Sequence, residues 1–149
     1  YYHFKDKYDL VNWIFCSEFI DRARAHRGAK EWRLMQALCE YLDANRAFYH
    51  RVFAAEGQNC FTEYFSEFVA SVISEEVKKM FADQNEEDMA FYIGFYTDAF
   101  VMSIRKWILK QEDISSRRFI HLLRTGLIHT SLAVLQRLPR GNEQQEENV

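Results

Sequence analysis

The chain has 149 residues, a formal net charge of −3 and three cysteines, and almost half of its residues are hydrophobic. This length suits one domain with a core that needs neither disulfides nor a metal. The slightly acidic balance excludes a surface that is basic overall, so any contact with nucleic acid has to be local. The longest apolar run, Met89 to Tyr96, is far shorter than the ~20 residues of a membrane span, and we predict no membrane contact.

The pattern of residues along the chain predicts an all-α fold. The only proline is Pro139, and apolar side chains recur at spacings of three and four. Asp6, Asn45 and Asn59 are placed to cap helices, and three acidic residues after Asn85 suit a helix start. We therefore expect a bundle of about six helices, over residues 7–28, 30–44, 46–55, 60–83, 86–110 and 116–138. The polar segment 139–149 is expected to be a disordered tail.

The last two predicted helices are unusually apolar. The helix over 86–110 has hydrophobic residues on nearly every side, which indicates burial on several faces. One interpretation is a self-association surface in which two helices from each of two chains form a four-helix bundle. The dimer interface would then include the following residues: Trp107, Phe119, Leu123, Gly126, Leu127, Thr130 and Val134. The alternative is that both helices form the centre of a monomeric bundle.

Aromatic residues are abundant in two stretches of the chain. Rings at helical spacing usually form the core, but rings with hydroxyl tips between helices also suit a pocket for an apolar or aromatic small molecule. The candidate pocket residues are Tyr64, Phe65, Phe68, Phe91, Tyr92, Phe95 and Tyr96. Asp98 lies on the same side as Phe91 and Phe95, where it faces solvent, an effector or a partner subunit.

Catalytic and metal-binding patterns are absent from the sequence. The five histidines form no H-x-x-x-H or H-E-x-x-H pair, and neither a glycine-rich phosphate loop nor a G-x-S-x-G motif occurs. Cys16, Cys39 and Cys60 make no C-x-x-C motif, which is typical of a reducing, cytoplasmic compartment. We predict no enzyme activity, no metal and no cofactor.

The first ten residues, YYHFKDKYDL, carry the most specific motif. They resemble the end of the DNA-binding domain in the TetR family of bacterial transcriptional regulators, where the recognition helix closes and the next helix opens. Tyr8 departs from the family pattern at a position that is usually acidic. The remaining similarity, in Trp13, the Asn45–Tyr49 break and Trp107, is looser and resembles the branch of dihydroxyacetone kinase regulators.

The resemblance implies residue roles and a domain order. Residues 1–4 would end a mostly missing helix-turn-helix, residues 5–138 would bind a ligand and dimerise, and residues 5–27 would form the connecting helix. Tyr1, His3 and Lys7 would contact the DNA backbone, with Phe4 in the core beneath them. The implied function is a homodimeric, ligand-responsive repressor with an unknown small-molecule effector and operator DNA as partners. The alternative is a co-activator of the same fold that does not bind DNA by itself.

Overall fold

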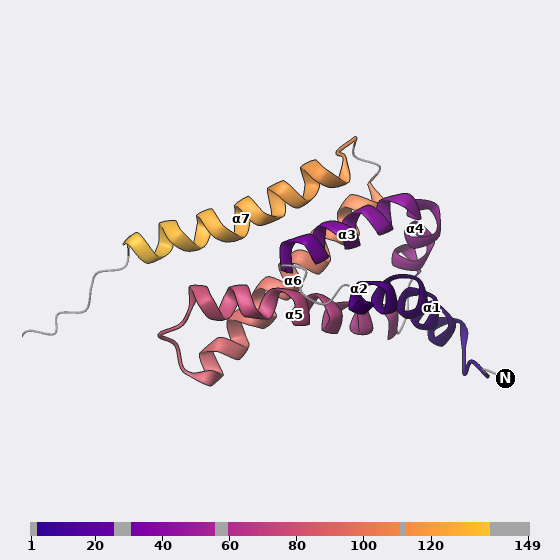
Figure 1. Cartoon of the computed structure of the whole chain (residues 1–149), viewed down its shortest axis with the longest axis horizontal. Coiled ribbons are helices and arrows are strands. Elements are labelled where there is room, and N and C mark those ends of the chain that lie inside the picture. The colour runs from indigo at the N-terminus through magenta and orange to yellow at the C-terminus, as the bar shows by residue number, and fades with distance from the viewer. Residues whose placement is uncertain (1–2, 26–30, 56–59, 111–112, 138–149) are drawn as a thin grey trace, which may run out of the picture.

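The protein is described by a computed structural model that covers residues 3–25, 31–55, 60–110 and 113–137 (Figure 1). These residues form six helical rods and contain no strand, which confirms the all-α prediction. None of the helices in these ranges is long and apolar enough to cross a membrane. The predicted tail after Pro139 lies outside the described residues.

The first rod joins three helical segments without a break: α1 (Lys7–Phe15), a π-helical turn (Cys16–Ile20) and α2 (Asp21–Ala25). Asp6 caps it as predicted, since its carboxylate accepts hydrogen bonds from the Tyr8 and Asp9 amides at 2.8 and 2.9 Å. In the π-helical turn the Asp21 amide donates to the Cys16 carbonyl, five residues earlier. The predicted end of this helix near Gly28 lies outside the described residues.

The second and third rods are α3 (Glu31–Ala44) and α4 (Arg46–Ala54), separated by Asn45 alone. The break falls where the sequence predicted it, but the predicted cap is wrong. The Asn45 side chain makes no bond to the start of α4; its amide donates to the Tyr41 carbonyl at 2.9 Å and so closes the end of α3. Asparagine does this because its side-chain amide carries donors as well as an acceptor.

The centre of the fold is an antiparallel hairpin of α5 (Cys60–Met80) and α6 (Glu86–Leu109). Its turn points away from α1 and α4 (Figure 1). Asn85 caps α6 by accepting from the Asp88 amide at 2.9 Å, and three acidic residues fill the first turn. The capping role predicted for Asn59 lies outside the described residues.

The last rod, α7 (Ser116–Arg137), packs mainly on α3. The Ser115 hydroxyl caps it by accepting from the Arg118 amide at 3.2 Å. Figure 1 shows α7 running along the outer side of α3, with its last turns (yellow) standing apart from the other helices. Among the helices that the structure describes, none lies beside the last turns of α7 (Figure 1).

Trp107, near the end of α6, connects α4, α6 and α7. Its indole is 2% exposed, stacks almost parallel on Phe119 at 4.4 Å, and donates to the Ile114 carbonyl at 3.0 Å. The Arg46 guanidinium lies 4.7 Å from a Trp107 ring centroid and donates to the Trp107 carbonyl at 2.9 Å. Arg46 also pairs with Asp43 at 3.1 Å, so one side chain satisfies both a helix end and a carboxylate.

Replacing Arg46 with lysine should destabilise the protein, because an ammonium keeps the charge but not the planar fork that reaches both partners. We expect the R46K variant to lose about 1–2 kcal/mol of unfolding free energy in urea denaturation. The matched control is R51K, at an exposed arginine on the same helix. It should change the free energy by less than about 0.5 kcal/mol. Equal losses in the two variants would contradict the role given to Arg46.

Candidate functional site

The seven predicted pocket residues do not form one group in the structure. Tyr64, Phe65 and Phe68 lie in the first half of α5 and pack against Phe15. Tyr92 and Tyr96 pack instead against Phe81, beyond the other end of α5. Because Phe68 and Phe81 are 13 residues apart, the two groups are separated by about 20 Å along the helix axis.

Phe15 is the centre of the first group. Its fully buried ring lies 5.6 to 6.3 Å from seven other rings. Most of these contacts are edge-to-face, the arrangement that the aromatic quadrupole favours. The rings belong to the first rod, α3, α4 and α5, so this cluster is a packed junction of four elements.

A chain of hydroxyl groups borders this junction. The Tyr41 hydroxyl lies 2.7 Å from that of Tyr49 and donates to the Glu18 carboxylate at 2.7 Å. Burial is the main cause that raises the pKa of Tyr41 to about 12, and burial also raises the pKa of the fully enclosed Tyr49. Both phenols therefore stay neutral near pH 7 and act as hydrogen-bond groups that tie the π-helical turn to α3 and α4.

The second aromatic group lies along α6 and is divided between a packed and an exposed side. Tyr92 stacks face to face on Phe81 with ring centroids 4.1 Å apart, and Tyr96 lies 6.0 Å from the same ring. Phe91 and Phe95 point away from this contact and are 67% and 58% exposed. Asp98 is exposed on the same side of the helix.

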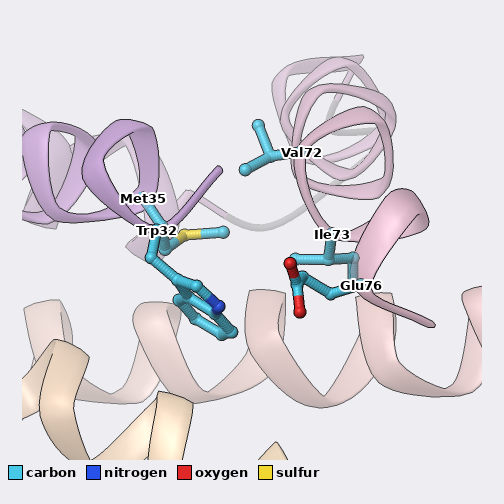
Figure 2. A pocket seen from close by; sticks show the side chains of 5 residues that line it. All are labelled: Trp32, Met35, Val72, Ile73 and Glu76. Carbon is cyan, nitrogen blue, oxygen red and sulfur yellow. The ribbon is translucent and has the colours of Figure 1, made fainter. Parts of the chain in front are cut away.

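A separate narrow space lies between α3 and α5, above α6 (Figure 2). It is lined by Trp32, Met35, Val72, Ile73 and Glu76, and it has no room for a water molecule: its empty volume of about 150 Å³ includes open solvent. The sequence analysis did not identify these residues as a set. The available signal was that Glu76 follows Val72 and Ile73 by four and three residues, which places its carboxylate on their side of α5.

The residues predicted to contact the DNA backbone lie at the start of the chain. His3 and Lys7 are exposed, and the Lys7 ammonium lies 5.0 Å from the Tyr8 ring centroid. Phe4 packs edge-on against Trp13 at 5.7 Å. Tyr1 lies outside the described residues. Contact of these side chains with DNA stays a prediction.

Some of the predicted dimer residues are buried within the folded chain, and others are exposed. Trp107, Phe119 and Leu127 are buried by packing within the chain, and Leu123 is partly buried against the same core. Gly126 is exposed, with open space around its Cα. The side chains of Thr130 and Val134 lie outside the described residues. That these residues form an interface remains a prediction; the structure shows three of them already covered by their own chain.

The part of the chain that the structure describes holds no cluster of three histidine, cysteine, aspartate or glutamate side chains suited to a metal. Cys39 is fully buried, and burial raises the pKa of its thiol to about 12, so it stays protonated and unreactive near pH 7. The chemistry available here is binding through rings, hydroxyl groups and isolated carboxylates.

Comparison with protein families matches residues 30–128 to the C-terminal region of TetR-type transcriptional regulators. The chain belongs to this family. The match spans 99 of the 149 residues, from the start of α3 into α7, and does not decide which branch of the family the chain falls in. No curated protein and no solved structure matches the chain. The TetR-type region therefore contains the narrow space, the second aromatic group and all but the first rod of the Phe15 junction.

The hydroxyl groups of Tyr41 and Tyr49 in this TetR-type domain should contribute differently to the unfolding free energy. The Y49F variant leaves the Tyr41–Glu18 bond intact, whereas Y41F leaves the Tyr49 hydroxyl buried without that partner. We expect Y41F to lower the unfolding free energy by about 1–3 kcal/mol and Y49F by about 1 kcal/mol, although Tyr49 is the more buried ring. Urea denaturation of both variants tests this order. A larger loss in Y49F would show that the chain of hydroxyls is not the source of the stability.

Alkaline pH should destabilise the domain because several groups hold their protons longer in the folded state. The pKa of Tyr41 and of Tyr64 rises from 10.0 to about 12, and that of Cys39 from 9.0 to about 12. The contribution of these groups to the unfolding free energy is fully present below about pH 9, where they are protonated in the folded and the unfolded state. It falls as the pH rises towards 12, because the unfolded state loses its protons first. Unfolding free energies measured between pH 8 and 11 should show this fall, with a smaller fall for Y41F above pH 10. A free energy that does not change with pH would contradict the packing described for these groups.

Proposed function

We propose that this TetR-type domain is the effector-binding and dimerisation part of a cytoplasmic transcriptional repressor. The observation that carries the proposal is the family match over residues 30–128. TetR-type regulators generally act as dimers that bind DNA and a small molecule, and their DNA-binding helices lie before the region matched here. In this proposal the helix-turn-helix precedes residue 5, and Tyr1, His3 and Lys7 contact phosphates, which fixes the register on DNA without reading bases.

The first rod supports a role in signal transmission. It leads from the proposed DNA-binding end into the Phe15 junction and continues through the π-helical turn. A dimer has to present its two recognition helices about one DNA turn apart, roughly 34–36 Å. A ligand that changes the packing of the bundle would tilt this rod and alter that separation, which couples the two sites.

The exposed side of α6 supports dimerisation. Phe91, Phe95 and Met102 lie within a narrow arc of the helix, and each is between 46% and 67% exposed. Three large apolar side chains in one row are unusual on the surface of a monomer and are typical of an interface. A second copy related by a two-fold axis would cover this row with the same row of its own. The exposed Leu122 and Gly126 of α7 offer a further contact for the partner's last helix.

A charge placed in the α6 row should separate the dimer. We expect the F95E variant of the intact regulator to sediment at half the mass of the wild type, because two like charges would face each other across the axis. Its affinity for operator DNA, measured by fluorescence anisotropy, should fall by more than about tenfold, since a monomer offers one half-site contact.

The matched control is F48E, which introduces the same charge at an exposed phenylalanine on α4. It should remain dimeric and keep its operator affinity. Circular dichroism of both variants verifies that they fold. A dimeric F95E variant would contradict the assigned interface, and a folded wild type that does not bind DNA from its own promoter would contradict the proposed function.

A further inference from the structure

α6 carries opposite charges at the two ends of its exposed apolar row. Three acidic residues fill its first turn, and Lys106 and Lys110 are exposed at its end. Between them, the Phe91 and Phe95 rings stack with centroids 6.4 Å apart, and Met102 continues the row. The outer side of α6 is therefore acidic at its start, apolar in its middle and basic at its end.

The charged residues beside this row form no ion pair with a described side chain of the same chain. Asp88 is exposed and accepts a hydrogen bond from the Asn85 amide at 3.0 Å. Lys106 is exposed, and the Arg105 guanidinium donates to the Phe53 carbonyl at 3.3 Å. Their charges can therefore pair with a partner molecule.

The charges are also ordered around the helix. At about 100° per residue, Asp88 and Lys106 lie on one flank of the row, each about 60° from Phe91. Glu87 and Arg105 lie on the other flank, each about 40° from Phe91. Each flank thus has one acidic residue near the helix start and one basic residue 18 positions later.

We propose that two copies of the domain pair through antiparallel α6 helices, with Phe91 of each chain opposite Met102 of the partner subunit. This inference rests on the proposed dimer and assigns it one orientation and one register. Asp88 precedes Phe91 by three residues, and Lys106 follows Met102 by four, so Asp88 lies beside Lys106 of the partner subunit. A two-fold axis perpendicular to the helices keeps the flanks separate. On the other flank, Glu87 meets the partner's Arg105.

Other arrangements bring unfavourable groups together. In a parallel pair, the acidic first turns of the two chains would meet, and so would the two basic ends. An antiparallel register with Phe91 opposite Phe95 of the partner subunit places Asp88 opposite the partner's Asp98. The opposite shift places Phe95 against the partner's Arg105. Charge complementarity therefore favours the register with Phe91 opposite Met102.

Asp98 is placed unfavourably in this register. The two-fold axis passes between residues 96 and 97, so the two Asp98 residues lie on the same flank, about 4.5 Å apart along the helix axis. Two like charges at this distance repel each other and weaken association. Removing them should therefore tighten the dimer, whereas an Asp98 that faces only solvent would have no such effect.

Sedimentation equilibrium of the 149-residue chain gives the dissociation constant of the dimer and tests this pairing. We expect D88K and K106E each to raise the constant by at least about tenfold, because each variant replaces two attractive contacts with repulsive ones. The double variant D88K/K106E reverses the pair and should return the constant to within about threefold of the wild type. D98N should lower the constant by at least about threefold.

The matched control is E86K, which changes the same charge in the same helical turn, but about 140° away from Phe91. Its constant should stay within about twofold of the wild type, and circular dichroism verifies that each variant folds. No rescue in the double variant, an E86K effect equal to that of D88K, or a D98N dimer no tighter than the wild type would each overturn the pairing. If F95E still separates the dimer in such a case, the proposed function stands. A wild-type chain that stays monomeric would overturn both.

Discussion

The packing of Phe15 against seven aromatic rings is the contact on which the arrangement of the bundle depends. It holds the first rod against α3, α4 and α5 at one point, and the Tyr41–Glu18 bond fixes the adjoining π-helical turn. A close-packed junction of this kind does not deform gradually, because moving one ring forces the others to new rotamers. The rod is therefore held in a defined position, which is what a helix that passes a signal to another domain requires.

α6 has a side that is buried within the chain and a side that is exposed and apolar. One side, which includes Thr97, Val101 and Ile104, is buried against the rest of the chain. The other side presents Phe91 and Phe95 to solvent. The hydrophobic residues found all around this helix are thus explained by intrachain packing on one side and, in our proposal, by a second copy on the other.

The sequence predicted the helices well because their signals are local. Asp6 and Asn85 act as caps at the predicted positions, and the observed ends of α4 and α6 lie within one residue of the expected ones. Asn45 was predicted correctly as a break and wrongly as a cap, because its side chain can donate backwards as well as accept forwards. Whether an asparagine side chain donates to the preceding helix or accepts from the following one depends on which backbone group lies closer to it in the folded chain.

Contacts between helices were less predictable, because periodicity gives the face of a residue and not its neighbour. The aromatic residues predicted to form one pocket fall into two groups, since their spacing along α5 and α6 was known but the antiparallel register was not. Trp107 was predicted to lie in the dimer interface because its helix is apolar on nearly every side. In the structure, Arg46, 61 residues earlier, and Phe119 pack against it within the chain. Glu76 was not singled out from the sequence, although its helical face already placed it with Val72 and Ile73.

Isotope-filtered NOE spectroscopy on a mixture of labelled and unlabelled chains tests most directly the central claim that two copies of the domain pair through the exposed side of α6. It detects contacts between copies without any substitution. We expect intermolecular NOEs from the Phe91, Phe95 and Met102 side chains to the same residues of the partner, and none from Trp107. Intermolecular NOEs confined to other helices, or none at concentrations where the chain is dimeric by sedimentation, would contradict it.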